Sequence, residues 1–215
     1  MASGPPLRPK LELMDGARVA RTLSRIAHEI AERHPDMKGL ALVGVRTRGV
    51  PLARRLARLL GEATGASPVV GALDITLYRD DFTTIAAQPV TKGTDIPFSI
   101  DGRTVVVVDD VLFTGRTVRA ALDQLIDFGR PARIELAVVV DRGHRELPIR
   151  ADYAGKTMTT AREEVVQVLL EEEDGRDGVL LLEREAAARA AKQAGANARK
   201  KAGAARPRAG RRPRR

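Results

Sequence analysis

The sequence predicts an α/β fold in which helices flank a central, mostly parallel sheet. Short apolar segments with strand character alternate along the chain with segments of helical periodicity, as expected when helical crossovers join parallel strands. Thr104–Val108 is an unbroken run rich in β-branched residues, which is typical of a central strand covered on both faces. A length of 215 residues suits one domain, or one domain with a tail.

Helices are predicted where apolar residues recur with helical spacing. The segments concerned are Met14–Glu32, Pro51–Leu60 and Thr117–Phe128. In the first segment, Val19, Leu23, Ile26 and Ile30 are spaced 4, 3 and 4 residues apart and form one apolar stripe. The proline that opens the second segment suits a first helical turn, where its missing N–H is not needed. A glycine directly after Phe128 closes the third segment.

Strands are predicted where short apolar runs lie between turn residues. These runs are Leu40–Val45, Val69–Leu77, Thr104–Val108, Ile134–Val140, Val165–Leu170 and Val179–Leu182. The last two should form a hairpin around the acidic, glycine-containing turn Glu171–Gly178. The polar stretch Tyr78–Phe98 is longer than an ordinary connection, which predicts a flexible lid or binding loop.

The positive charge of the chain is concentrated near its C-terminal end. The chain has 37 Lys and Arg against 28 Asp and Glu, but Arg189–Arg215 holds eleven of the basic residues and no acidic one. Residues 1–188 therefore carry a net charge of −2 within a total of +9. Because the tail has little apolar surface to bury, we expect residues 186–215 to be disordered. The tail is either a solubilising extension or a segment that attracts RNA non-specifically.

Composition also limits the possible classes of site. The chain has no cysteine, which excludes disulfides, zinc–thiolate sites and cysteine nucleophiles. Its apolar runs are too short to cross a membrane and its first residues lack a secretory signal, so we expect a cytoplasmic protein. We expect a flexible N-terminus over residues 1–10 and one folded domain over residues 11–185.

The strongest chemical signal begins at the end of the β-branched run. Two adjacent carboxylates, Asp109 and Asp110, are followed by a loop with Thr114 and Gly115 that opens a predicted helix. Backbone N–H groups at such a helix start can bind phosphate. The carboxylates would repel phosphate, but they suit ribose hydroxyls or a Mg²⁺ ion. The pattern therefore predicts a sugar-phosphate site, and it matches neither a P-loop nor a dinucleotide fingerprint.

This segment resembles the ribose-phosphate loop of type I phosphoribosyltransferases, which implies their fold. By this resemblance, Asp109 and Asp110 are the catalytic carboxylates and hold the ribose. The residues implied around the ribose and 5′-phosphate are Val111, Leu112, Phe113, Thr114, Gly115, Arg116 and Thr117. An earlier strand is followed by a loop that resembles the pyrophosphate loop of the same family. Its residues are Arg46, Thr47, Arg48 and Gly49.

Three further blocks narrow the resemblance to the PyrR family of pyrimidine operon regulators. They are Ser24–Glu29, Asp74–Asp81 and Asp141–Tyr153, within a similarity that runs from Leu11 to Leu182. The resemblance implies UMP-dependent binding to a stem-loop in pyrimidine-operon leader mRNA, with transcription attenuation, and it implies UMP and UTP as nucleotide partners. It also implies the reaction of uracil with PRPP (phosphoribosyl diphosphate) to UMP and diphosphate, with Mg²⁺, in a homodimer or larger homo-oligomer.

The resemblance also implies roles for residues outside the two loops. Arg142 would lie on the uracil side. Mg²⁺ would be held through the substrate and have no direct protein ligand, with Asp109 and Asp110 left open as the candidates for a direct contact. The residues implied at the RNA are Arg21, Ser24, Arg25, His28, Arg33, His144, Arg145, Arg150 and Lys156. Lys156–Glu164 departs from the family pattern. Two alternatives remain open: a salvage enzyme without RNA regulation, and a regulator without turnover.

Overall fold

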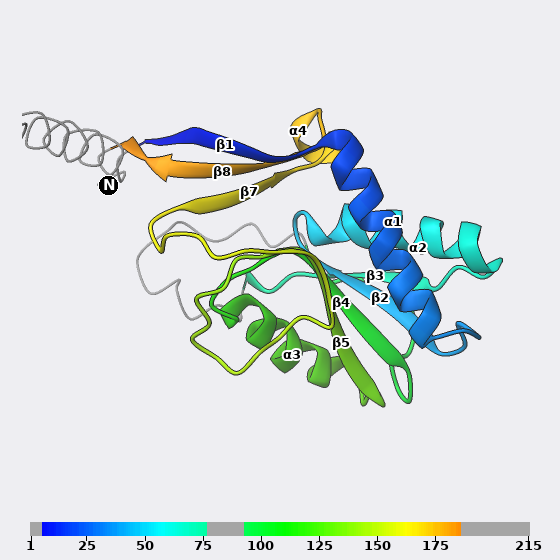
Figure 1. Cartoon of the computed structure of the whole chain (residues 1–215). Coiled ribbons are helices and arrows are strands. Elements are labelled where there is room, and N and C mark those ends of the chain that lie inside the picture. The colour runs from blue at the N-terminus through cyan, green and yellow to red at the C-terminus, as the bar shows by residue number, and fades with distance from the viewer. Residues whose placement is uncertain (1–5, 77–92, 186–215) are drawn as a thin grey trace, which may run out of the picture.

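The computed structural model describes residues 6–76 and 93–185, and within these it contains a five-stranded parallel sheet (Figure 1). The strand order is β3-β2-β4-β5-β6, and every neighbouring pair runs parallel. The strand bounds are β2 Leu40–Val45, β3 Val69–Leu73, β4 Thr104–Leu112, β5 Arg133–Asp141 and β6 Tyr153–Thr157. The predicted α/β architecture with a parallel sheet is confirmed.

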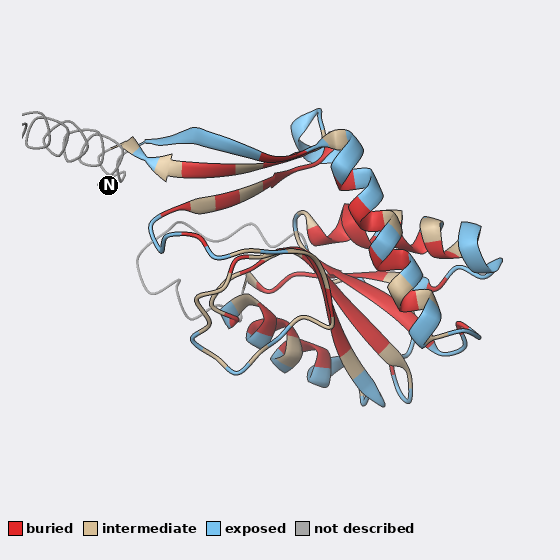
Figure 2. Ribbon diagram, viewed as in Figure 1, coloured by how far each residue is buried: buried red, intermediate tan, exposed pale blue. Residues whose placement is uncertain are grey.

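Helices cover both faces of this sheet (Figure 1). Helices α1 (Gly16–Arg33) and α2 (Gly49–Thr64) pack on one face, and α3 (Arg116–Phe128) packs on the other. The β-branched run divides accordingly, since Val106 and Val108 join the core beneath α1 and α2 whereas Val105 and Val107 join the core beneath α3. Figure 2 shows the buried central strands between the two layers of helices. Burial on both faces explains why Val105–Val108 contains no polar residue.

Helix α1 starts two residues later than predicted, because Met14 and Asp15 belong to a strand. The Asp15 side chain accepts a hydrogen bond of 2.7 Å from the N–H of Arg18, which caps the helix. The predicted apolar stripe is buried, and it includes Val19 and Ile30 with no exposed surface. The helix therefore forms from a capped start and one apolar face.

A second sheet lies above the large sheet in Figure 1, next to the start of α1, and has the order β1-β8-β7. Its strands are antiparallel and span β1 Leu7–Asp15, β7 Val165–Leu169 and β8 Gly178–Arg184. The predicted hairpin is confirmed, and its turn contains the short helix α4 (Glu171–Asp174). Residues 7–10, which we expected to be flexible, lie in β1. The sequence does not predict this strand, because most of its residues are exposed and its partner β8 follows more than 150 residues later in the chain.

Other boundaries differ from the predictions in ways that affect the site. Strand β4 continues through Leu112, so the acidic pair lies within its last residues instead of after it. Strand β3 ends at Leu73 instead of residue 77. Strand β6 was not predicted, since its short sequence is largely polar. Residues 78–92 of the predicted lid (Tyr78–Phe98) and the basic tail (residues 186–215) lie outside the described residues.

A buried polar cluster fixes the end of α1 to the sheet. Glu135 Oε2 accepts a hydrogen bond of 2.7 Å from the Tyr153 hydroxyl and lies 2.9 Å from His34 Nε2. Burial alone would raise the pKa of Glu135, but these two contacts hold it below its usual range. The cluster therefore ties together α1, β5 and β6 at the sheet edge where the strands start.

Candidate active site and basic groove

The sheet topology creates a crevice between the ends of β2 and β4. These strands are neighbours, but the chain after β2 enters α2 on one face and the chain after β4 enters α3 on the other. Ligands of open α/β sheets bind where connections diverge in this way, outside the carboxyl ends of the strands. The two loops that the sequence singled out, Arg46–Gly49 and Phe113–Gly115, both leave the sheet here. The fold therefore brings the two predicted halves of one site together.

Two glycines allow the first loop to lie tightly against the sheet. A Cβ atom on Gly44 would lie 2.4 Å from the carbonyl oxygen of Gly49. A Cβ atom on Gly49 would lie 2.2 Å from the carbonyl oxygen of Val108 on β4. Both contacts are with backbone, which cannot move aside as a flexible side chain can. The start of α2 is thus held directly beside the end of β4.

The acidic pair lies near the end of β4, with Asp109 buried and Asp110 half-buried. The Asp109 carboxylate accepts a hydrogen bond of 2.9 Å from the N–H of Asp110. The Asp110 carboxylate accepts one of 2.8 Å from the N–H of Val111. Burial raises the pKa of the Asp110 carboxyl, although the Val111 hydrogen bond and the charge of Arg48 act in the opposite direction. An acid kept in an unfavourable environment is a frequent feature of functional sites.

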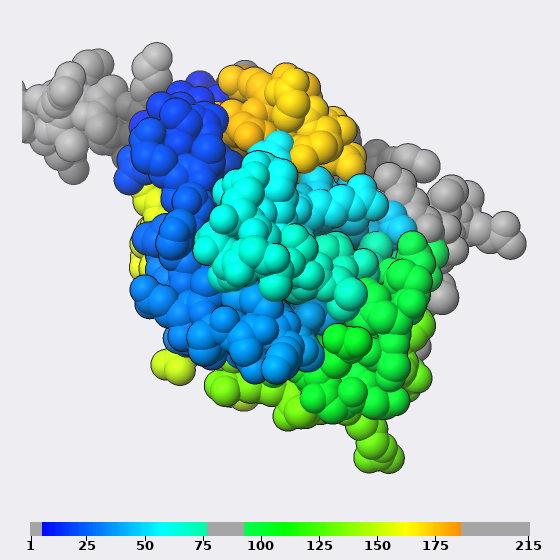
Figure 3. Space-filling view, turned by 90° about the vertical axis from the view of Figure 1, so that its right-hand side faces the viewer, coloured from blue at the N-terminus to red at the C-terminus, as the bar shows by residue number. Residues whose placement is uncertain are grey.

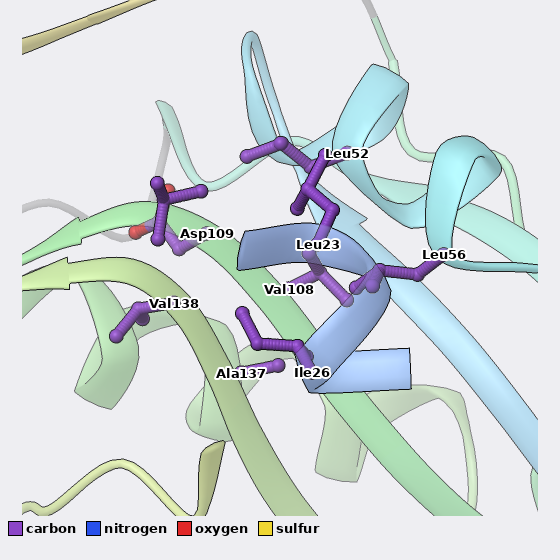
Figure 4. Close-up of a pocket in the computed structure, with 9 residues that line it drawn as sticks. Leu23, Ile26, Leu52, Leu56, Val108, Asp109, Ala137 and Val138 are labelled. Carbon is purple, nitrogen blue, oxygen red and sulfur yellow. The ribbon is translucent and has the colours of Figure 1, made fainter. Parts of the chain in front are cut away.

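Apolar side chains close over Asp109 from one side. Figure 4 shows this residue at the end of β4, with side chains of α1 and α2 around it. The void between them is too small for a water molecule. The residues that line it are Leu23, Ile26, Leu52, Leu56, Val108, Asp109, Ala137, Val138 and Val139. The carboxylate therefore lies against a dry layer that strengthens its electrostatic interactions.

The phosphate loop leads into a helix whose N-cap residue is a glycine and so has no side chain to cap it, although Thr114 Oγ1 accepts a long hydrogen bond of 3.4 Å from the N–H of Arg116. Gly115 has a φ of 93°, a left-handed conformation that glycine adopts without strain, and it directly precedes α3. The carbonyl oxygen of Thr114 accepts hydrogen bonds from the N–H groups of Glu146 and Leu147, at 3.0 and 3.3 Å. The Arg116 side chain turns to Glu146, with Nε 2.9 Å from Oε2. Residues 146 and 147 therefore hold the loop in place through hydrogen bonds, and a fixed loop of this kind suits phosphate binding by its backbone N–H groups.

The pyrophosphate loop borders a cleft of about 170 Å³. Its lining residues are Arg46, Thr47, Val50, Pro51, Arg54, Glu172 and Glu173. The peptide bond between Arg46 and Thr47 is cis. Arg46 Nε donates to the carbonyl oxygen of Gly93 at 2.9 Å, whereas Arg48 pairs with Asp174 of the β7–β8 turn. Sequence analysis missed this acidic partner, because it read the acidic run only as a turn.

Arg142, predicted on the uracil side, is buried and contacts protein groups. Its guanidinium lies 4.0 Å from the centre of the Phe113 ring and donates to Thr160 Oγ1 at 3.0 Å and to the carbonyl oxygen of Ala161 at 2.9 Å. Burial lowers the pKa of Arg142, with a smaller opposing effect from Glu164. These contacts make Arg142 a support for Phe113, a residue of the predicted ribose-phosphate loop.

The comparisons with known proteins agree with this geometry. The phosphoribosyl transferase domain family matches residues 11–173. The protein named Bifunctional protein PyrR from Thermus thermophilus is 60% identical over 181 residues, covering 84% of this chain and 100% of that relative. The relative of the same name from Clostridioides difficile is 54% identical over 174 residues, covering 81% of this chain and 98% of that relative. The chain belongs to the PyrR family.

Solved structures extend the comparison to the fold. The hypoxanthine phosphoribosyltransferase of Trypanosoma cruzi superposes with a TM-score of 0.63 at 18% identity, covering 82% of this chain and 98% of that one. HGPRT-ase from Leishmania tarentolae, solved in complex with GMP, has the same TM-score, identity and coverage. Identities this low establish the fold only. The predicted type I phosphoribosyltransferase fold and enzyme class of this PyrR-family chain are confirmed.

A basic groove of about 310 Å³ runs between α1 and β6 of this PyrR-family domain. Its lining residues are Met14, Arg18, Arg21, Thr22, Arg25, Gly155 and Lys156. Arg25 donates to the carbonyl oxygens of Ala154 and Gly155, at 3.0 and 2.6 Å, so it also joins α1 to β6. The groove brings Lys156 to the arginines of α1, although more than a hundred residues separate them in the sequence.

The other residues predicted at the RNA lie in different environments. The guanidinium of Arg145 pairs with Asp141 and donates to the carbonyl oxygen of Phe113 at 2.6 Å, which braces the phosphate loop. His144 Nε2 lies 2.6 Å from the carbonyl oxygen of Thr160. Arg33 lies over the Tyr153 ring at 4.8 Å. Ser24, His28 and Arg150 lie outside the groove lining, and the His28 ring nitrogen Nδ1 is 2.7 Å from the carbonyl oxygen of Ser24.

Within residues 6–76 and 93–185, no three His, Asp or Glu side chains gather to hold a metal ion. In the same part of the chain, no helix is both long and apolar enough to cross a membrane.

Proposed function

We propose that the chain converts uracil and PRPP to UMP and diphosphate. The observation that carries this proposal is that the acidic pair, the start of α3 and the Arg46–Gly49 loop all lie at the carboxyl ends of the neighbouring parallel strands β2 and β4, close enough for the charge of Arg48 to act on Asp110. A sugar phosphate with a pyrophosphate group needs these three environments at once. Membership of the PyrR family supports the same reaction.

The proposed mechanism relies on positioning and electrostatics. The N1 atom of uracil bonds to C1 of the ribose as the bond from C1 to the pyrophosphate oxygen breaks, and the proton of N1 passes to the departing diphosphate. Asp109 and Asp110 hold the ribose hydroxyls and stabilise the positive charge that develops near C1. The backbone N–H groups from Gly115 to Thr117 bind the 5′-phosphate, and Arg46 and Arg48 bind the departing pyrophosphate. Such charges act strongly here because the site is partly closed to water.

The arrangement suits a Mg²⁺ ion that enters the site bound to the substrate PRPP. The two carboxylates at the end of β4 are oxygen ligands of the kind that Mg²⁺ prefers. Bound with PRPP, the ion would neutralise part of the negative charge that accumulates on the pyrophosphate.

The first expected result is UMP formation by the purified chain. Uracil, PRPP and Mg²⁺ should give UMP and diphosphate in equal amounts, measured by chromatography of the nucleotide and by a diphosphate assay. Hypoxanthine in place of uracil serves as the control for base specificity, and it should give no nucleotide above background. A wild-type sample that makes no UMP under these conditions would contradict the proposal.

We also propose UMP-dependent binding to the leader mRNA of a pyrimidine operon, in the basic groove. The groove gathers four cations on a domain that is otherwise slightly acidic. Arginine and lysine supply affinity through phosphates, and a folded stem-loop adds shape and unpaired bases for specificity. The alternative, a salvage enzyme without RNA regulation, predicts UMP formation with no affinity for this RNA.

A double substitution tests the groove. Arg21→Gln with Lys156→Gln should weaken RNA binding and lower the slope of log affinity against log salt by about 2, since each removed phosphate contact lowers it by about 1. Filter binding across a salt series, with and without UMP, measures both quantities. Arg58→Gln on α2 removes an exposed arginine outside the groove and should leave the slope unchanged. Equal slopes for the double variant and wild type would exclude the groove as the RNA site.

A further inference from the structure

Two arginines, one just before α2 and one within it, fasten the pyrophosphate loop to the acidic turn of the second sheet. Arg55 of α2 forms paired hydrogen bonds with both Glu172 and Asp177, at 2.5 to 2.8 Å. Arg48, the N-cap residue of the same helix, pairs with Asp174. Figure 3 shows the turn, in yellow-orange, directly against the cyan surface of α2. The turn is therefore a fixed part of the wall beside the pyrophosphate cleft.

The contact between Arg48 and Asp174 orients the guanidinium. Nη2 and Nε of Arg48 lie 2.8 and 3.3 Å from the two carboxylate oxygens of Asp174, so the carboxylate takes one edge of the planar group. An arginine has five N–H donors, and three of them are not used by Asp174. The pairing thus fixes the plane of the side chain and leaves donors for a second anion.

Asp174 is itself held in place. Its Oδ2 atom accepts a hydrogen bond of 3.0 Å from the N–H of Leu170, and its side chain is only 19% exposed. Burial alone would raise the pKa of Asp174, but the hydrogen bonds from Arg48 and Leu170 hold it below its usual range. The carboxylate is therefore charged at neutral pH, and the clamp made by Arg55 keeps the turn that carries it against α2.

We infer that Asp174 is a positioning residue that holds Arg48 ready for the pyrophosphate group of PRPP. This inference rests on the proposed function of the Arg46–Gly49 loop. Arg48 precedes the first residue of α2 and has a long side chain with many rotamers, so an unpaired Arg48 would lose conformational entropy on binding. Prior orientation by Asp174 removes that loss from the binding step. The opposite possibility is that Asp174 competes with pyrophosphate for Arg48, and it predicts an opposite change in affinity.

The test compares Asp174→Asn with Glu171→Gln. Both substitutions remove one negative charge from the same turn, and asparagine retains an acceptor for the N–H of Leu170. The side chain of Glu171 is exposed, and the carboxylate that pairs with Arg48 is that of Asp174. Asp174→Asn should raise the KM for PRPP and the inhibition constant of diphosphate about tenfold, as expected for the loss of one charged hydrogen bond. The KM for uracil should stay within about twofold, and Glu171→Gln should leave all three constants within that range.

A second pair of variants shows whether Asp174 acts through Arg48. In an Arg48→Ala background, Asp174→Asn should have no further effect on the KM for PRPP, because the group that it orients is gone. If thermal unfolding shows that Asp174→Asn is not folded, Asp174→Ser is used in its place, because the serine hydroxyl can also accept the hydrogen bond from Leu170.

The outcomes separate this inference from the proposed function. A wild-type chain that makes no UMP overturns the proposed function. An active wild type whose Asp174 variants have an unchanged or lower KM for PRPP overturns the positioning role alone. An equal effect of Asp174→Asn with and without Arg48 overturns it as well, because the residue would then act on the cleft by another route.

Discussion

Asp110→Asn is expected to lower kcat by about 100- to 1,000-fold, the usual effect of removing one electrostatic group that stabilises a transition state. In the proposed mechanism, the ribose gains positive charge as pyrophosphate leaves, and the neutral amide cannot stabilise that charge. The KM for PRPP should change much less than kcat, because most of the substrate's charge is bound by the other loops. Initial rates of UMP formation at saturating and limiting PRPP measure the two constants.

The same substitution should leave the fold intact. The carbonyl oxygen of asparagine can still accept the hydrogen bond from Val111. Because burial raises the pKa of Asp110, its ionised form is less stable in the folded chain than in the unfolded one. The neutral amide removes that cost at neutral pH, so the unfolding temperature should equal or exceed that of wild type. This balance is typical of a residue kept for activity at the expense of stability.

Asp123→Asn provides the matched control for this experiment. Asp123 lies on α3 with a 52% exposed side chain and pairs with Arg119, away from the acidic pair. Its replacement should change kcat by less than about twofold, since exposed ion pairs contribute little. If Asp110→Asn retained a rate within a few-fold of wild type, the carboxylate would have no part in the reaction.

The part of the site that depends on neighbouring residues could be predicted from the sequence. The run from Thr104 to Thr117 contains a buried strand, an acidic pair, a glycine turn and a helix start in one uninterrupted segment. Each of these features follows from local chemistry, and the structure has them in this order. The Arg46–Gly49 loop could be predicted for the same reason, since it follows a strand that is buried along its whole length.

Contacts between distant segments could not be predicted in this way. Arg48 and Asp174 are 126 residues apart, and no periodicity or motif connects them. The same holds for Phe113 and Arg142, whose contact gives the arginine a supporting role that sequence position alone did not indicate. Long-range pairing is decided by the packing of whole elements, so the partner of a charged side chain emerges only once the fold is known.

Exposed edge strands form the other class of missed features. Strand β1 has six exposed residues at its start and pairs with β8 only through tertiary structure. Strand β6 lies at the edge of the large sheet, and Gly155 within it permits close contact with α1, since a Cβ atom there would lie 2.5 Å from Thr22 Cγ2. Such strands lack the apolar pattern of a buried one. One wall of the basic groove is β6. The sequence therefore predicted the arginines of α1 that line the groove, but not the strand that faces them.

Gly49→Ala is the substitution expected to have the largest effect on stability. The added Cβ would lie 2.2 Å from the carbonyl oxygen of Val108, so either α2 or β4 must shift. We expect a loss of roughly 3 kcal/mol in the free energy of unfolding, at the upper end of the range for overpacked cores. The shift would also displace Arg48 and open the crevice between β2 and β4. Denaturant unfolding and the KM for PRPP of the remaining folded protein measure the two effects.

Gly16→Ala separates this steric effect from the general effect of replacing a glycine. A Cβ on Gly16 would meet its nearest neighbour, Asp177 Cβ, at an ordinary contact distance of 3.4 Å, at the first residue of α1. Such a replacement should be neutral or stabilise the chain by about 0.4–1 kcal/mol, because alanine restricts the unfolded state. If Gly49→Ala were as stable as wild type, the close contact between α2 and β4 would not exist in solution. An unchanged KM for PRPP in a destabilised Gly49→Ala variant would instead show that the pyrophosphate loop keeps its shape without that contact.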